Sequence, residues 1–316
     1  VRDLEILSDD DREQLIRQST GTAPADSTGL LHELFARQAA LTPDAIALVE
    51  GGRSVSYRAL QHTAVGWSRA LPAQAVAPDD LVAVALDRGI DLVTAYLGIL
   101  GAGGAFVPLD LSYPRARLLS MVERCGTRRV VTTAATARAL GLGDQAILVE
   151  SLMSPDAPAR MPQPVPSSAA AYGIFTSGST GEPNCVVVSH AAIVNTLTWR
   201  QRYMPLERDD RVLQAMSPSF HGSVWEFFAP LTAGACVVLS LPSGIEGRPL
   251  IARALADEQI SVLQMTPSWL GVLLDDPALP EAGRLRRVIC GAEPLPRTLQ
   301  ERVFDALDVD LYNLYG

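Results

Sequence analysis

Residues 175–183 read FTSGSTGEP and directly follow an apolar run that is typical of a β-strand. The two glycines and four hydroxyl residues of this segment make a loop whose backbone N–H groups can face an anion, with the hydroxyls as further donors. A phosphate group matches that description, although the GxxxxGK[ST] spacing of a Walker A loop is absent. The segment alone leaves two interpretations open, a phosphate-binding loop and an ordinary flexible loop.

Around this loop, apolar runs with the character of strands alternate with helical patterns. Beyond residue 168, we expect strands at 170–175, 185–188, 235–240, 261–264 and 287–290, and helices at 190–202, 223–232, 248–257, 267–274 and 296–306. The same alternation begins near the amino end, with a helix and a strand between residues 31 and 49. This pattern predicts an α/β fold of two similar subdomains, with parallel-rich sheets covered by helices.

Proline content suggests where the two subdomains separate. Five prolines lie between residues 151 and 168, which indicates a linker by composition. We therefore expect a first α/β subdomain at 29–150 and a second at 169–316, which carries the loop. Residues 1–28 are polar, with a short helical pattern behind Ser8, and are expected to be an inter-domain linker. The chain begins without Met, which favours a piece of a longer protein or a processed chain.

Composition disfavours several classes of protein. The 316 residues carry a net charge of −9, which argues against nucleic acid as a partner because phosphate binding relies on basic patches. The four cysteines lie far apart with no CxxC pair, so neither a disulfide framework nor a zinc site is expected. No run reaches the roughly 18 to 20 apolar residues that span a bilayer. We expect no membrane partner, no metal ligands and a cytoplasmic location.

The segment 175–190 resembles the phosphate-loop signature of the adenylate-forming superfamily, in particular that of the adenylation domains of nonribosomal peptide synthetases. The signature is [YF]-T-S-G-[ST]-T-G-x-P-K-G-V-x-x-x-H, and ten of its twelve specified positions match. Other family motifs follow in the same order along the chain. They lie at residues 31–47, at 55–60 (similar to LSYxEL), 100–117 (LKAGGAYVPLDPxYPxxR), 220–227 (FDxSVWEF), 291–295 (GGEAL) and 313–316 (the opening of NxYGPTE).

The resemblance implies a two-step reaction. A carboxylate attacks the α-phosphate of ATP to give an acyl-adenylate and pyrophosphate, and the acyl group then passes to a phosphopantetheine thiol on a carrier domain. ATP and Mg²⁺ are the implied cofactors. The implied partners are the carrier and condensation domains of the same synthetase, and a small activator protein of the kind that some such domains require is a further candidate.

The resemblance also assigns residues to the nucleotide. By position, the ATP or AMP site would comprise Thr176, Ser177, Gly178, Ser179, Thr180, Gly181, Gly291, Ala292, Asn313, Tyr315 and Gly316. The loop residues would surround the pyrophosphate end, and Tyr315 would stack on the adenine ring. Small residues at 291 and 292 would let the ligand approach the backbone. For Tyr315, the alternative is an aromatic side chain of the core.

A second set of positions corresponds to the family's substrate pocket. In this sequence the set comprises His221, Gly222, Trp225, Gln264, Ile289, Gly291 and Leu314. Trp225 is expected to narrow the pocket or, alternatively, to pack against its own helix. Gln264 would add one polar group to surroundings that are otherwise mostly apolar. The set predicts a medium-sized, mostly apolar acid.

The sequence departs from the family pattern at three places. Asn184-Cys185 replace the Lys-Gly pair that closes the phosphate loop, which removes a positive charge and a flexible backbone position. His221 replaces the acidic residue that anchors the α-amino group of amino-acid substrates. The sequence stops at Gly316, inside a motif, so the later motifs of the family, with the barrel and lid subdomains, are largely absent. All 26 basic residues are Arg, so no lysine in this chain can replace the catalytic lysine of the lid.

These departures leave the activity open. His221 indicates an acid without a free α-amine, such as a hydroxy, keto or aryl acid, or no substrate at all, while a histidine of the core is a third interpretation. Our prediction is ATP-dependent activation of a carboxylic acid in nonribosomal peptide biosynthesis, with little activity expected of this chain alone. The alternative is a non-catalytic pseudo-adenylation domain that acts as a scaffold between condensation and carrier domains.

Overall fold

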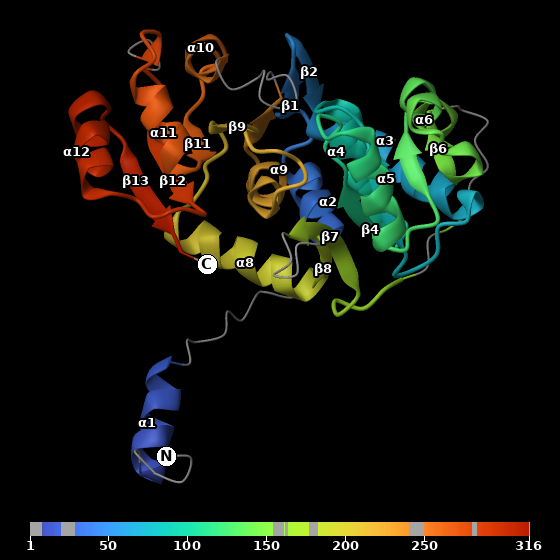
Figure 1. The fold of residues 1–316 in the computed structure, drawn as a ribbon, viewed down its shortest axis with the longest axis horizontal. Helices are drawn as coiled ribbons and strands as arrows, with labels where there is room; N and C mark the ends of the chain where they lie inside the picture. The colour runs from blue at the N-terminus through green and yellow to red at the C-terminus, as the bar shows by residue number, and fades with distance from the viewer. Residues whose placement is uncertain are drawn as a thin grey trace.

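The computed structural model describes residues 8–19, 29–153, 161, 164–176, 183–239, 250–279 and 283–315. In these ranges, helices and strands alternate and form two sheets (Figure 1), as the sequence predicts. The helices are α1 (Asp9–Ser19), α2 (Leu31–Leu41), α3 (Tyr57–Ala70), α4 (Ile90–Gly101), α5 (Arg115–Arg124), α6 (Ala134–Leu140), α7 (Val149–Leu152), α8 (His190–Tyr203), α9 (His221–Ala233), α10 (Ile251–Asp257), α11 (Pro267–Leu274) and α12 (Arg297–Ala306). Short 3-10 helices occur at Leu71–Gln74 and Gly143–Gln145.

Parallel pairing dominates both sheets. The seven-stranded sheet has the order β13 (Asp310–Leu314), β12 (Arg287–Gly291), β11 (Val262–Met265), β9 (Arg211–Leu213), β10 (Cys236–Val238), β1 (Ile46–Glu50) and β2 (Arg53–Ser56). The six-stranded sheet has the order β6 (Ala146–Leu148), β5 (Val130–Thr132), β3 (Leu81–Ala85), β4 (Ala105–Pro108), β7 (Ala170–Thr176) and β8 (Asn184–Ser189). The antiparallel pairs are β1 with β2 and β7 with β8.

The strands of each sheet come from both sides of the boundary that proline content suggests. Leu48 of β1 lies opposite Val237 of β10, so the first two strands belong to the sheet of the later strands. Phe106 of β4 lies opposite Tyr172 of β7, so β7 and β8 belong to the sheet of the earlier strands. The segment 151–168 therefore does not separate the two sheets. Composition predicts where one element ends and the next begins, but it does not predict which strands pair. Strand pairing depends on packing between residues far apart in the sequence.

A large apolar core joins the two sheets. It contains side chains of both sheets and of α9, which lies between them (Figure 1). Phe106 stacks on Tyr96 with ring centroids 4.1 Å apart, and its ring is 5.6 Å from Tyr172 and 5.8 Å from Phe228 of α9. Buried aromatic pairs contribute more than their area alone. This packing fixes α9, and with it the position of its first turn.

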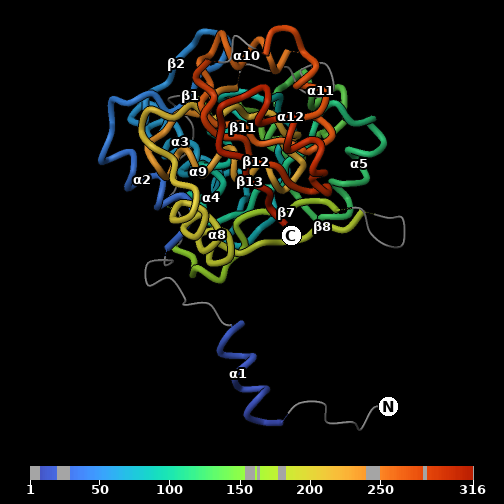
Figure 2. The backbone as a smooth tube through the Cα atoms, turned by 90° about the vertical axis from the view of Figure 1, so that its left-hand side faces the viewer, coloured from blue at the N-terminus to red at the C-terminus, as the bar shows by residue number. Residues whose placement is uncertain are grey.

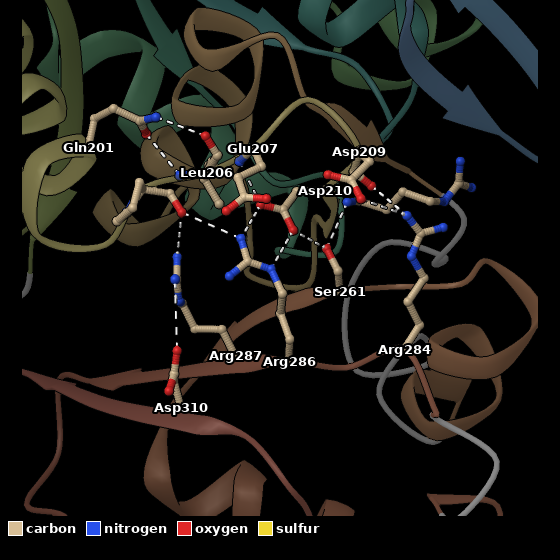
Figure 3. Close-up of polar contacts among 12 residues, drawn as sticks. Gln201, Leu206, Glu207, Asp209, Asp210, Ser261, Arg284, Arg286, Arg287 and Asp310 are labelled. Carbon is tan, nitrogen blue, oxygen red and sulfur yellow. Dashed lines mark hydrogen bonds and ion pairs between the residues drawn. The ribbon is translucent and has the colours of Figure 1, made fainter.

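A polar network joins the amino ends of several strands in the seven-stranded sheet (Figure 3). Asp210, which precedes β9, is 2% exposed. Its carboxylate accepts hydrogen bonds from Arg286 Nε at 2.8 Å and from Ser261 Oγ at 2.7 Å, and these residues precede β12 and β11. The network therefore connects the amino ends of three parallel strands, on the side of the sheet opposite their carboxyl ends.

Helix α1 lies apart from the rest of the described chain (Figure 2), and none of its residues is buried. The capped helix expected behind Ser8 is present, since Ser8 Oγ accepts a hydrogen bond from the Asp11 N–H at 3.2 Å. Leu15 and Ile16 are 48% and 57% exposed. This helix contributes nothing to the core.

No helix within the described ranges combines the length and the apolar character needed to cross a membrane. Over the same ranges, no group of three or more His, Cys, Asp and Glu side chains is arranged to hold a metal ion. The four cysteines are free thiols, and Cys125, Cys236 and Cys290 are buried.

Candidate functional site

A cavity of about 310 Å³ lies at the carboxyl ends of β11, β12 and β13. Gln264, Gly291 and Leu314 line it from these strands, while α8 and the first turns of α9 line it from the other side. Open α/β sheets characteristically bind ligands at this edge. The cavity is therefore the first candidate for a binding site.

The two predicted sets of site residues meet in this cavity. From the set assigned to the substrate, the lining includes His221, Gly222, Trp225, Gln264, Gly291 and Leu314. From the set assigned to the nucleotide, it includes Gly291, Ala292 and Tyr315. Residues from β11, β12, β13 and α9 thus come together from a stretch of sequence that runs from His221 to Leu314.

Three described residues of the predicted sets lie outside the lining of the cavity. Ile289, assigned to the substrate pocket, is 0% exposed and belongs to the large core. It lies two residues before the end of β12, among core side chains, and is not part of the lining of this cavity. Asn313 is exposed on β13, and Thr176 is exposed at the end of β7.

The remaining loop residues cannot be placed from the described ranges. Ser177, Gly178, Ser179, Thr180, Gly181 and Gly316 lie outside them. The base of the loop is described, because Thr176 pairs with Asn184 across the antiparallel strands β7 and β8. The exposed Asn184, at the position of the family's lysine, therefore lies directly beside the start of the loop.

The residues assigned to the nucleotide differ in conformation and exposure. Ala292 has φ = +67°, in the left-handed region that side chains other than glycine rarely adopt. A Cβ added to Gly291 would lie 3.4 Å from the carbonyl oxygen of Leu314, which is an ordinary van der Waals contact. The side chain of Tyr315 is fully exposed among the described residues and lies in the lining of the cavity. These features leave backbone and an aromatic face open to a planar ligand.

His221 is the first residue of α9 and is exposed, so it is not a histidine of the core. The cavity walls still enclose part of its ring. Burial and, second, the positive charge of Arg200 lower the pKa of His221, so the imidazole is neutral at neutral pH. A neutral ring at a helix N-terminus cannot pair with an ammonium group, as a carboxylate at this position would.

Arg200 of α8 is a residue of the cavity that the sequence analysis missed. It is 7% exposed, and its Nη2 donates a hydrogen bond to Oε1 of Gln264 at 2.9 Å. Its guanidinium carbon lies 4.1 Å from the ring centroid of Trp225, which is a cation–π arrangement. Trp225 therefore lines the cavity and also packs against a neighbouring helix.

The sequence predicts that Gln264 adds a polar group to the cavity. In the structure, the amide of Gln264 already forms hydrogen bonds within the protein. Its Oε1 accepts the hydrogen bond from Arg200, and its Nε2 donates to the carbonyl oxygen of Gly222 at 2.8 Å. Both ends of the amide are thus engaged by the protein. The role of Gln264 in this structure is to orient the guanidinium of Arg200.

Glu226 lies in α9, one residue after Trp225, and is fully buried. Its carboxyl group accepts hydrogen bonds from Gln214 Nε2 at 2.9 Å and from the Met216 N–H at 3.1 Å. Burial raises the pKa of Glu226 to about 8, although the bond from Met216 and the charge of Arg88 oppose the rise. Glu226 thus holds the chain after β9, which forms part of the cavity wall at Met216.

A second cavity, of about 490 Å³, adjoins the first. Met216, Phe220 and Gln264 line both cavities and separate them. In the second cavity, Arg88 donates a hydrogen bond from Nη2 to the Met216 carbonyl oxygen at 3.1 Å, and Asp110 accepts one from the hydroxyl of Ser217. These polar contacts hold the segment between β9 and α9 in place.

The contribution of α8 to the first cavity has a signal in the sequence. The buried residues of α8 are His190, Ile193, Val194, Leu197 and Arg200, which follow the spacing of the inner face of a helix. Ile193, Leu197 and Arg200 line the cavity. A helix expected at 190–202 therefore carries an arginine where its own period predicts an apolar residue, and that mismatch could have identified Arg200.

Comparisons with known proteins identify the family of this chain. Residues 35–316 match the family model described as AMP-binding enzyme. Tyrocidine synthase 3 of Brevibacillus parabrevis is 34% identical over 318 residues, which are 100% of this chain and 5% of that protein. Enterobactin synthase component F of Escherichia coli is 37% identical over 294 residues, 90% of this chain and 22% of that protein. The chain thus spans a small part of the length of these relatives.

Solved structures show the same fold. The nonribosomal peptide synthetase FmoA3, in its AMPPNP-bound form, is 29% identical and superposes with a TM-score of 0.86 over 98% of this chain and 33% of that chain. The N-terminal subdomain of Klebsiella oxytoca NpsA, in complex with 3-hydroxyanthranilyl-AMSN, has a TM-score of 0.83 over 93% of this chain and 75% of that chain. Its identity of 20% supports a shared fold alone.

The fold, the cavity and the family model define the class of protein. The chain belongs to the family of AMP-binding enzymes. The proteins that it matches along nearly its whole length include nonribosomal peptide synthetases, as the motifs in its sequence predict.

Proposed function

We propose that this chain provides the nucleotide-binding and acid-selecting surface of an adenylate-forming ligase. The ligase would activate a carboxylic acid without a free α-amine, such as a hydroxy, keto or aryl acid, for transfer to the phosphopantetheine thiol of a carrier domain. One observation carries the proposal: residues assigned to the nucleotide and residues assigned to the acid line the same cavity. Carrier and condensation domains of the same synthetase are the proposed partners.

The residues of the cavity suit the proposed ligands. Bound ATP supplies the α-phosphate that a carboxylate attacks and the pyrophosphate that leaves, with Mg²⁺ as its counter-ion. On the protein side, the exposed ring of Tyr315 offers a face on which adenine could stack. Gly291 and Ala292 leave the backbone accessible beside that ring, because neither carries a side chain larger than a methyl group.

The charge of the cavity supports an acid without an ammonium group. The described lining includes no Asp or Glu, and His221 is neutral at neutral pH. An ammonium buried here would have no carboxylate partner in the described lining, at a cost of roughly 3–5 kcal/mol if it is fully desolvated. That cost corresponds to a discrimination of about 10²-fold or more against α-amino acids.

ATP–pyrophosphate exchange on the full natural chain tests this proposal. The substrates are matched pairs, each an α-amino acid and the 2-hydroxy or 2-keto acid with the same side chain, together with aryl acids. We expect exchange with at least one acid that lacks the amine, and exchange about 10²-fold weaker with its amino-acid counterpart. A preference for the amino acid within each pair would refute the assignment of His221.

A second candidate function is that of a non-catalytic scaffold between condensation and carrier domains. The observation that favours it is Asn184, which lies beside Thr176 where the family carries the lysine of the phosphate loop. Without that charge, the binding of pyrophosphate oxygens is weaker. Absence of exchange with every acid, from a protein that is demonstrably folded, would favour this candidate over the ligase.

A further inference from the structure

The guanidinium of Arg200 is a buried charge without a charged partner in the described structure. None of the ion pairs among the described residues involves Arg200. Its Nε is buried and has no hydrogen-bond partner in the part of the chain that the structure describes. Buried charges are ordinarily paired, because desolvation of an unpaired ion costs several kcal/mol. The charge of Arg200 therefore calls for a partner from outside the described chain.

Glu226 does not satisfy this need. Glu226 raises the pKa of Arg200 through its charge, which indicates that the two side chains are near each other. They nevertheless form no hydrogen bond or ion pair in the described structure. Burial raises the pKa of Glu226 to about 8, so this carboxyl is mostly protonated at neutral pH. Burial also lowers the pKa of Arg200, but only to about 9, which leaves the guanidinium charged at neutral pH.

The protein holds this guanidinium in one orientation at the wall of the cavity. Gln264 accepts its Nη2 hydrogen bond, and the ring of Trp225 lies against its face. A guanidinium presents five N–H donors in a planar fork, which matches the two oxygens of a carboxylate. The guanidinium of Arg200 is already oriented and desolvated, so it can bind a ligand at a lower cost than a mobile charge on the surface.

We infer that Arg200 binds a second carboxylate on the acid that this cavity accepts, so that the substrate is a short-chain dicarboxylic acid. The inference rests on the proposed function, because it names the substrate class of the same cavity. Both contacts of Arg200 are made to residues at substrate-pocket positions, Trp225 and Gln264, and not to Ala292 or Tyr315 at the nucleotide positions. The reacting carboxylate must lie at the nucleotide, so Arg200 is positioned for the other end of the molecule.

The size and polarity of the cavity agree with such a substrate. A volume of about 310 Å³ accommodates a short-chain acid beside part of a nucleotide. Apart from Arg200, the lining includes the apolar side chains Ile193, Leu197 and Met216, which would contact the methylene groups between the two carboxylates. A long apolar chain would leave Arg200 desolvated and unpaired.

Equilibrium binding on the full natural chain tests the inference independently of catalysis. Calorimetry would compare succinic, glutaric and adipic acids with butanoic, pentanoic and hexanoic acids, which match them in chain length but lack the second carboxylate. We expect at least one dicarboxylic acid to bind roughly 30-fold more tightly than its matched partner, because a desolvated charged pair is worth 2 kcal/mol or more. Equal binding within every pair would overturn the inference, and this comparison needs no variant.

Two variants locate the effect at Arg200. Arg200→Met should weaken dicarboxylate binding roughly 30-fold or more and leave monocarboxylate binding within about threefold. Because it removes a buried charge that has no charged partner in the described ranges, it should leave the unliganded protein at least as stable as the wild type. Arg202→Met makes the same substitution on the exposed face of α8 and should change neither class of acid. An equal loss for mono- and dicarboxylic acids in Arg200→Met would overturn the inference.

The outcomes distinguish this inference from the proposed function. Arg200-dependent binding of a dicarboxylic acid without any pyrophosphate exchange would support the inference and contradict the ligase. Exchange driven by a monocarboxylic acid, undiminished in Arg200→Met, would support the ligase and contradict the inference.

Discussion

Glu226→Gln should change how the stability of this protein depends on pH. Glu226 is fully buried in α9, and burial raises the pKa of its carboxyl group from 4.5 to about 8. Below pH 4.5 the carboxyl is protonated in the folded and the unfolded chain, and its ionisation carries no penalty. Between pH 4.5 and 8 the unfolded chain releases this proton while the folded chain retains it, so stability falls as pH rises. Above pH 8 the loss is complete.

The size of this effect follows from the pKa difference. The rise from 4.5 to about 8 is about 3.5 pKa units, and each unit corresponds to about 1.4 kcal/mol. The full penalty is therefore about 5 kcal/mol at most, of which about 4 kcal/mol develops between pH 5 and pH 9. Relaxation of the core around the ionised group reduces it, so we expect a measured value of about 2–4 kcal/mol.

The glutamine variant removes the ionisation but preserves the shape of the side chain. Its amide oxygen can still accept the hydrogen bond from the Met216 N–H. The new amide N–H group would lie near Gln214, whose buried Oε1 has no partner among the described residues and could accept it. The variant should thus be about as stable as the wild type at pH 5 and more stable at pH 9.

Urea unfolding of both proteins at pH 5 and pH 9 measures the prediction. The change in unfolding free energy between the two pH values is obtained for each protein, and the two changes are subtracted. Other titrating groups contribute equally to both proteins and cancel in this double difference. A double difference below about 1 kcal/mol would refute the reasoning, because Glu226 would then be ionised in the fold at little cost.

Four further outcomes are expected. His221→Asp should create or increase amino-acid-dependent exchange, and unchanged exchange would contradict our interpretation of His221. Asn184→Lys should tighten ATP binding, measured by calorimetry, since it restores a cation beside the loop; an unchanged dissociation constant would remove that explanation. Burial and, second, the neighbouring His32 lower the pKa of His190 to about 4, so stability should fall as pH drops from 6.5 towards 4. His190→Gln should reduce that loss in urea unfolding, and an equal loss in both proteins would count against it. Asp210→Asn should destabilise the fold by about 2–4 kcal/mol, because it breaks a largely buried ion pair (Figure 3), whereas Asp44→Asn in an exposed pair should cost under about 1 kcal/mol in the same assay.

The sequence predicts the elements of this fold better than their partners. Helix 190–202 and strand 287–290 agree with α8 and β12 to within a residue, because their periodicity is strong. The three-residue strand β9 was not expected, since so short a segment carries no measurable period. The pairing of Leu48 with Val237 could not be predicted either, because hydrophobic pattern identifies a strand but not its neighbour.

For the candidate site, too, the sequence predicts some features and not others. The positions of the family's motifs predicted a shared site for His221, Trp225 and Gly291, and these residues line one cavity. The prediction was possible because the motifs occur at the carboxyl ends of strands and the first turns of helices. The orientation of side chains was not predictable from those positions. Gln264 was expected to face a ligand and instead holds Arg200, and Ile289 was expected in the lining and is covered by the core. Packing settles both cases.

The charges of the cavity bear on the choice between ligase and scaffold. Relative to the family pattern, the acid at position 221 is replaced by a neutral imidazole, and Arg200 adds a positive charge within reach of it. The two features act together: the first removes the partner of an ammonium, and the second supplies the partner of a carboxylate. A scaffold gains nothing from a buried guanidinium that has no charged partner among the described residues, because an apolar side chain of similar size would be neutral or stabilising there. A charge that costs stability and is held in place by Gln264 and Trp225 is better explained by a ligand, which favours the ligase.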